Sequence, residues 1–238
     1  MNVWSPPDLD QPQDGYRFTS DAFILAAFAR AFAGPRWCDL GTGSGVIAHQ
    51  LAQFIGGEGY AVERQAALIP YARHNLAGAP VTLIEGDLTC FPWQGKSLDL
   101  VVCNPPYYEV GAGHINRSRT KAEARHTFYG GVREFADVIW QALSDSGYFC
   151  FVFPFDLHQR PLRDLQKRGW CLQRRLLVRS FEGRQPKLIC LALSKQPQKT
   201  IEECDINIYQ SHRVHTDELQ TFLITGRLPR PIQYLDPV

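Results

Sequence analysis

The chain has 238 residues, 45% of them hydrophobic and 21% charged, which allows a sizeable buried core and excludes an intrinsically disordered protein. Its formal net charge of +1 argues against strong indiscriminate binding of nucleic acid, although residues 1–103 carry −4 (6 Lys/Arg, 10 Asp/Glu) and residues 104–238 carry +5 (19 and 14). No apolar stretch reaches the roughly 18 residues of a membrane span, and the N-terminus lacks a signal peptide, so we expect a cytoplasmic protein. The seven cysteines are scattered along the chain and form no metal-binding or disulfide pattern, so we expect no metal site.

From residue 20 onward, predicted helices and strands alternate along the chain. Apolar residues at helical spacing predict helices over residues 20–32, 46–54, 65–76 and 132–143. Short apolar runs between the helices predict strands over residues 37–40, 60–63, 81–84, 98–103 and 148–153. This alternation is typical of an α/β fold, and we predict a doubly wound, mainly parallel, Rossmann-like sheet.

The pattern changes after residue 170. Strands predicted over 172–178 and 188–193 are separated by too few residues for a parallel crossover, so they should form an antiparallel hairpin at the edge of the sheet. One more strand over 206–209 and a short helix over 217–223 are expected. We treat the chain as one domain with three parts: an N-terminal segment that closes a cofactor pocket (1–36), a core (37–195) and a C-terminal extension (196–238).

A glycine-rich loop lies between the first predicted strand and the helix that follows it. Gly41, Gly43 and Gly45 leave room for a ligand to approach the backbone, because a Cβ atom would occupy the same space. The signal alone is weak. Together with Ala48, the last two glycines also match the dinucleotide-binding pattern G-x-G-x-x-A, and a purely structural tight turn would use the same residues.

Acidic residues lie at the ends of the first three predicted strands. Asp39 precedes the glycines, Glu63 ends the second strand and Asp87 follows the third. Glu63 suits the hydroxyls of a ribose, which NAD and S-adenosylmethionine share. The three acids have no obvious basic residue beside them that could bind the pyrophosphate of NAD. They favour a ligand with a cationic sulfonium and an α-amino group, although each acid alone could simply cap a helix. The run from Asp39 to Gly45 resembles the D/E-x-G-x-G-x-G signature of class I methyltransferases, which implies S-adenosylmethionine as cofactor.

The tetrapeptide Asn104-Pro105-Pro106-Tyr107 follows the fourth predicted strand. Its prolines stiffen the turn and remove two backbone donors, so that the Asn104 oxygen and the Pro105 carbonyl are offered as acceptors. Such acceptors can hold both hydrogens of a conjugated NH₂ group and aim its lone pair at a methyl donor, while Tyr107 stacks on a base. The motif resembles that of methyltransferases acting on adenine N6, cytosine N4 or a glutamine amide, and alone it does not choose among them.

A third motif precedes the first predicted helix: residues 15–22 read Gly-Tyr-Arg-Phe-Thr-Ser-Asp-Ala. With this motif, the glycine loop and the tetrapeptide, residues 12–195 resemble the bacterial tRNA1(Val) adenine-N6 methyltransferase family. The resemblance implies methylation of the adenine 3′ of the anticodon, at position 37. It also implies that Phe18, Thr19 and Asp21 help to close the cofactor pocket, although the same residues could cap and staple the first helix. The expected cofactor-binding residues are Phe18, Thr19, Asp21, Asp39, Gly41, Thr42, Gly43, Gly45, Glu63, Asp87, Leu88 and Asn104.

A basic stretch follows the tetrapeptide. Its cations could clamp RNA phosphates or belong to a solvated loop; they are Arg117, Arg119, Lys121 and Arg125. A second group near the predicted hairpin could extend this surface: Arg174, Arg175, Arg179, Arg184 and Lys187. We expect tRNA as the partner and find no sign of an obligate protein partner.

Three alternatives to a tRNA enzyme remain open. A release-factor type of protein-glutamine N5-methyltransferase shares both motifs, but normally carries an N-terminal helical domain, for which the 36 residues before the first predicted strand are too few. Another RNA or DNA amino-methyltransferase would fit the tetrapeptide equally well. An inactive cofactor-binding module is disfavoured, because Asn104 and Tyr107 are intact.

Overall fold

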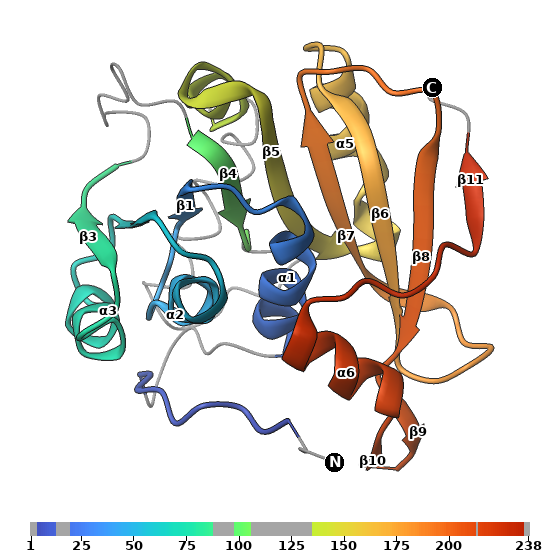
Figure 1. Ribbon diagram of the computed structural model, residues 1–238, viewed down its shortest axis with the longest axis horizontal. Coiled ribbons are helices and arrows are strands. Elements are labelled where there is room, and N and C mark those ends of the chain that lie inside the picture. The colour runs from blue at the N-terminus through green and yellow to red at the C-terminus, as the bar shows by residue number, and fades with distance from the viewer. Residues whose placement is uncertain (1–3, 13–19, 88–97, 106–134, 213, 236–238) are drawn as a thin grey trace, which may run out of the picture.

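The computed structural model describes residues 4–12, 20–87, 98–105, 135–212 and 214–235. Its main feature is a nine-stranded sheet in the order β11-β8-β6-β7-β5-β4-β1-β2-β3, which runs across the whole molecule (Figure 1). Its strands are β1 (Arg36–Leu40), β2 (Glu58–Glu63), β3 (Val81–Glu85), β4 (Leu98–Cys103), β5 (Leu143–Pro154), β6 (Cys171–Arg179), β7 (Pro186–Ser194), β8 (Ile201–Asn207) and β11 (Gln233–Leu235). A separate two-stranded sheet pairs β9 (Tyr209–Ser211) with β10 (Val214–His215).

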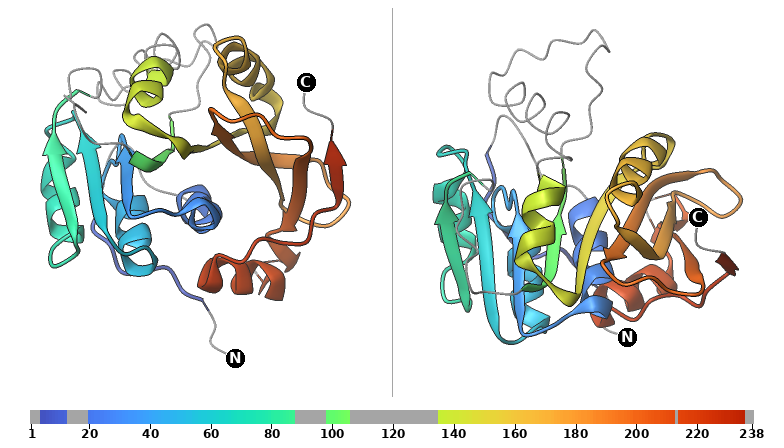
Figure 2. Two further views of the ribbon diagram at one scale, coloured as in Figure 1. Left: turned by 45° about the horizontal axis from the view of Figure 1, so that its top comes forward. Right: turned by 90° about the horizontal axis from the view of Figure 1, so that it is seen from above.

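Helices cover both faces of the sheet (Figure 2). The α-helices are α1 (Ser20–Ala29), α2 (Val46–Phe54), α3 (Ile69–Asn75), α5 (Gln159–Gln166) and α6 (Asp217–Thr225), with 3-10 turns η1 (Arg30–Phe32) and η3 (Phe155–Leu157); residues 135–142 are also helical. One core cluster joins α1, α2 and α6 to the first face, and a second joins α5 and residues 135–142 to the other. Within the described ranges, no helix is long and apolar enough to cross a membrane.

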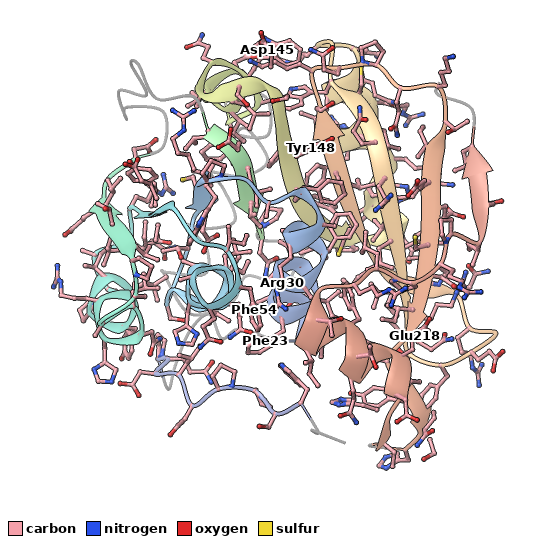
Figure 3. All side chains as sticks on the ribbon, viewed as in Figure 1. Phe23, Arg30, Phe54, Asp145, Tyr148 and Glu218 are labelled. Atoms are coloured by element: carbon pink, nitrogen blue, oxygen red, sulfur yellow. The ribbon has the colours of Figure 1, made fainter. Side chains whose placement is uncertain are left out.

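Helix α1 is almost wholly enclosed, because it packs against the sheet, α2 and α6. All its residues after Ser20 are buried, as expected for a helix that is apolar on every side. Figure 3 shows Arg30 and Phe54 where these three helices meet. The Arg30 guanidinium lies 3.4 Å from the centre of the Phe54 ring, and its Nη1 donates to the Ile224 carbonyl at 3.1 Å. Burial lowers the pKa of Arg30 to about 10.

The predicted α/β architecture is confirmed. β4, β1, β2 and β3 are parallel neighbours, β5 is parallel to β4, and β6 and β7 form the expected antiparallel hairpin. The hairpin is not the edge of the sheet, however, because β8 pairs in parallel with β6 and β11 pairs with β8. Residues 195–200 are long enough to connect β7 to β8, because β7 ends on the side of the sheet where β8 begins.

Ion pairs between β6 and β8 accompany this unexpected neighbour. Two of the pairs join register partners of the two strands, Arg174 with Glu202 and Arg175 with Glu203. The third joins Arg179 with Asp205, two residues before its register partner Asn207. Three arginines that we had considered for a basic surface are therefore engaged within the sheet. Arg184 and Lys187 remain exposed.

Glu203→Ala should lower the free energy of unfolding by roughly 2–3 kcal/mol, because it leaves the mostly buried Arg175 guanidinium without its carboxylate. The Glu203 side chain is only 4% exposed and that of Arg175 25%. Glu202→Ala is the matched control: both side chains of its pair are about 30% exposed, at 32% for Glu202 and 27% for Arg174, so the loss should be about 0.5 kcal/mol. Urea unfolding measures both, and equal losses would contradict this account.

Candidate active site

The carboxyl ends of four parallel strands bring the sequence-predicted residues to one edge of the sheet. Asp39 lies in β1 and Glu63 ends β2. Asp87 follows β3 by two residues, and Asn104 follows β4 directly. Leu40 and Cys103 are register partners, so the glycine loop and Asn104 leave the sheet from adjacent strands, which lie about 5 Å apart.

The glycine loop uses its glycines for two different reasons. Gly41, Gly43 and Gly45 all have positive φ, at 68°, 62° and 87°, a conformation that favours glycine. A Cβ atom on Gly41 or Gly43 would meet no atom of the described residues within 4 Å, whereas one on Gly45 would lie 3.2 Å from Leu76 Cγ. The first two glycines therefore leave space beside the backbone within the described part of the chain, and the third allows α3 to pack on the loop.

Asp39 is buried beneath the loop, and one of its carboxylate oxygens has no hydrogen-bond partner among the described residues. Its Oδ2 accepts from Thr42 Oγ1 at 2.5 Å and from the Ala48 amide at 3.0 Å. Its Oδ1 is fully buried and accepts no hydrogen bond from the residues that the structure describes. Burial raises the pKa of Asp39 to about 7, with a smaller contribution from the Glu63 charge, against the lowering effect of the two hydrogen bonds.

Glu63 supports the loop from the neighbouring strand. One carboxylate oxygen accepts from the Gly43 amide and the other from the Gln65 amide, both at 2.8 Å. Each oxygen can accept a further hydrogen bond. The side chain is thus fixed in place and still able to bind a hydroxyl pair.

Asp87 differs from the other two acids, because its side chain is 40% exposed and lies 3.6 Å from Arg64 Nη1. The expectation that no basic residue stands beside the acids is therefore wrong. Arg64 directly follows Glu63 in the chain, but its direction could not be read from sequence. Its charge is paired with Asp87, while Asp39 and Glu63 remain buried and acidic.

The structure covers part of the predicted transfer site. Asn104 is half-buried and Pro105 buried. Asp21 is buried in the first turn of α1, where its Oδ1 accepts from the Ala22 amide at 3.0 Å. The other predicted site residues lie outside the described residues: Phe18, Thr19, Leu88, Pro106, Tyr107, Arg117, Arg119, Lys121 and Arg125.

Sequence reasoning missed two contributions to the loop. Thr42, expected to touch the cofactor, donates its hydroxyl to Asp39. Asn75, at the end of α3, donates to the Ser44 carbonyl, and no motif marks it. Long-range partners of this kind are visible only once α3 is placed on the loop.

The residues present fit an S-adenosylmethionine cofactor. An ammonium group would supply the donor that Asp39 Oδ1 lacks, and a ribose would match Glu63. The open space above Gly41 and Gly43 admits close approach of a ligand to the backbone. Because the Arg64 guanidinium is already paired with Asp87, the described part of the site suits a cation better than a pyrophosphate.

Comparisons with known proteins agree with this arrangement. Residues 38–125 match the family described as "Methyltransferase domain". A tRNA1(Val) (adenine(37)-N6)-methyltransferase of Salmonella enteritidis is 31% identical over 74% of each chain. One of Shewanella amazonensis is 29% identical over 86% of this chain and 89% of the relative.

A solved structure shows the same fold. The predicted O-methyltransferase from Agrobacterium tumefaciens superposes with a TM-score of 0.65 at 15% identity, covering 88% of this chain and 97% of that one. The fold, the paired motifs and the sequence relatives lead to one assignment. The chain belongs to the tRNA1(Val) (adenine(37)-N6)-methyltransferase family and is an S-adenosylmethionine-dependent methyltransferase.

Proposed function

We propose that this enzyme transfers a methyl group from S-adenosylmethionine to N6 of an adenine in tRNA, namely the adenine at position 37 of tRNA1(Val). The names of the curated relatives support this substrate. The observation that carries the proposal is the position of Asn104 and Pro105, which follow β4 directly beside the loop of β1. This places two hydrogen-bond acceptors next to the proposed cofactor site.

On the cofactor side, buried groups of this chain hold and orient the donor. Asp39 Oδ1 accepts from the ammonium, and Glu63 accepts from the ribose hydroxyls. Gly41 and Gly43 let the ligand lie against the backbone. When bound, S-adenosylmethionine supplies an electrophilic methyl group on a sulfonium. We also assign Phe18, Thr19, Asp21, Thr42, Gly45, Asp87, Leu88 and Asn104 to this pocket.

On the substrate side, the Asn104 side-chain oxygen and the Pro105 carbonyl accept the two hydrogens of the adenine amine. These bonds draw the nitrogen toward tetrahedral geometry and direct its lone pair at the methyl group, so that they strengthen in the transition state. Pro106 stiffens the turn, and Tyr107 stacks on the extruded base. Transfer would break the methyl–sulfur bond of the donor as the new N–C bond forms, and the methylated amine would release one proton to solvent. Asn104 accepts a hydrogen bond from the amine and takes no proton.

The proposed domain organisation keeps these parts in one unit. Residues 37–195 form the core, residues 1–36 close the cofactor pocket, and residues 196–238 extend the same domain. The extension contributes β8 and β11 to the main sheet, and α6 contacts α1.

Position 37 is tested with two transcripts of tRNA1(Val), one unchanged and one with guanine in place of adenine 37. The enzyme and labelled cofactor should methylate the first and leave the second unlabelled. Equal labelling of both would overturn the assignment of position 37. A release factor serves as a third substrate, and its methylation in preference to tRNA would support the glutamine alternative instead.

The basic stretch is expected to hold tRNA phosphates. Replacing Arg117, Arg119 and Lys121 by Ala should weaken tRNA binding and reduce the slope of log affinity against log salt by up to roughly 3, because each lost phosphate contact changes the slope by about 1. Cofactor affinity should stay unchanged. Filter binding at several salt concentrations measures the slope, and an unchanged slope would remove these residues from the RNA-binding surface.

A matched control removes exposed cations at the amino ends of two strands, at the edge of the sheet opposite to Asn104. Lys167 and Lys199 are exposed and lie before β6 and β8, respectively. The double variant Lys167→Ala, Lys199→Ala should bind tRNA with the parent's salt slope. If the double variant lost as much tRNA affinity and salt slope as the triple variant, tRNA binding would depend only on the overall charge of the protein.

A further inference from the structure

Asn75 joins three parts of the chain that are far apart in sequence. It is the last residue of α3 and is 8% exposed. Its Oδ1 accepts from the Asp10 amide at 2.8 Å, and its Nδ2 donates to the Asp10 carbonyl at 2.7 Å and to the Ser44 carbonyl at 2.8 Å. The amide's two donor hydrogens and its oxygen are thus all engaged, which also fixes its orientation.

The bond to Ser44 fixes one peptide group of the cofactor loop. The Ser44 carbonyl is held by Asn75, and the amide of the same peptide, that of Gly45, donates to the Thr42 carbonyl at 2.9 Å. Rotation of this peptide would break both bonds. Gly45 is also the N-cap of α2, so the orientation of the peptide sets how the loop enters the helix whose Ala48 amide holds Asp39.

The bonds to Asp10 attach the N-terminal segment to the same point. Residues 4–12 extend from α1 and α6 to α3 (Figure 1). At one end the Trp4 ring contacts Phe23, with centroids 5.2 Å apart, and the Trp4 amide donates to Gln220. At the other end Asp10 meets Asn75. A nearby ion pair between His74 and Asp10 is exposed on both sides, at 72% and 62%, and adds little.

We propose that Asn75 is a positioning residue that sets the affinity for S-adenosylmethionine. It acts through the Ser44 carbonyl and holds the Ser44–Gly45 peptide, and with it the glycine loop, in the cofactor-binding conformation. Its second role is to anchor the segment that leads into residues 13–19. The inference rests on the cofactor lying at the glycine loop.

The test compares Asn75→Asp with the parent enzyme. The aspartate keeps the shape but replaces the Nδ2 amide nitrogen, which carries both donor hydrogens, by one oxygen that faces the Asp10 and Ser44 carbonyls. The Kd and KM for S-adenosylmethionine should therefore rise about tenfold or more, as expected when buried acceptors lose their donors. The methylation rate at saturating cofactor should stay within about twofold, because Asn75 does not contact the reacting atoms. Calorimetry gives Kd, and single-turnover methylation gives the rate.

His74→Ala is the control, because it removes only the exposed ion pair from the neighbouring position and should leave cofactor affinity unchanged. Should Asn75→Asp fail to fold, as judged by circular dichroism, Asn75→Ala tests the same loss of donors without a buried charge. Parent-like affinity in a folded variant would overturn the inference, as would a fall in rate with unchanged affinity. If the parent enzyme itself does not bind S-adenosylmethionine, the proposed cofactor site is wrong, and not only the role of Asn75.

Discussion

Replacing Asn104 by Ala should lower the rate of methyl transfer by a factor of about 100 or more, while cofactor and tRNA still bind. The expected size is that of losing one preorganised group that acts on the developing transition state. Asn104 also borders the cofactor pocket, but it holds the amine as it becomes tetrahedral, so its contribution lies mainly in the transition state. The rigid Pro105 turn that follows remains in place in the variant.

Single-turnover methylation of tRNA measures this rate, beside separate titrations of cofactor and tRNA. A fall in rate that is at least about tenfold larger than any loss of cofactor or tRNA affinity supports the assignment. Asn104→Asp is an informative companion, because it keeps the side-chain acceptor oxygen while a second, charged oxygen replaces the amide nitrogen. It should retain more activity than Asn104→Ala. A near-parental rate for Asn104→Ala would show that the turn is merely structural.

Asp39 should make cofactor binding depend on pH. Burial raises its pKa to about 7, and the ammonium binds the ionised carboxylate. As the pH falls below about 7, the ionised fraction falls, and the apparent Kd should rise by up to about tenfold per pH unit. Binding near pH 7 should release protons, because the bound cation favours the charged form of Asp39.

Asp39→Asn should weaken S-adenosylmethionine binding by roughly 30-fold to 100-fold, in line with the loss of a charged hydrogen bond of about 2–3 kcal/mol, and should abolish this pH dependence. Calorimetry between pH 5.5 and 7.5 measures both effects. His49→Gln is the control, because His49 in α2 is another ionisable side chain, and burial lowers the pKa of its imidazole. If His49→Gln flattens the pH profile and Asp39→Asn does not, the assignment to Asp39 is wrong.

The central part of the fold was readable from sequence because its signals are local. β4 and α2 have the predicted bounds, since β4 is an apolar run that stops at Asn104-Pro105 and α2 is an apolar segment that directly follows Gly45. α5 was missed because its segment offers only Leu162 and Leu165 as buried residues. A strand is predicted over 206–209, whereas β8 spans Ile201–Asn207. Its start is not predicted because Glu202, Glu203 and Asp205 interrupt the apolar pattern, and their arginine partners in β6 are known only from the tertiary structure.

The site shows the same division between local motifs and long-range contacts. The positions of Asp39 and Glu63 followed from the strand ends, and the structure places both at one edge. The unpartnered Oδ1 of Asp39, the pairing of Arg64 with Asp87 and the three bonds of Asn75 depend on how separate segments meet. Side-chain direction and partner choice across long sequence separations are not encoded in a motif.

Methylation of bulk tRNA tests the central claim most directly. The enzyme and labelled S-adenosylmethionine are incubated with tRNA from a strain that lacks the gene, the RNA is digested, and the labelled nucleoside is identified. The account predicts a single labelled product, N6-methyladenosine, which is absent when Asn104→Ala replaces the parent enzyme. Label in another nucleoside, or in protein and not in tRNA, would contradict it.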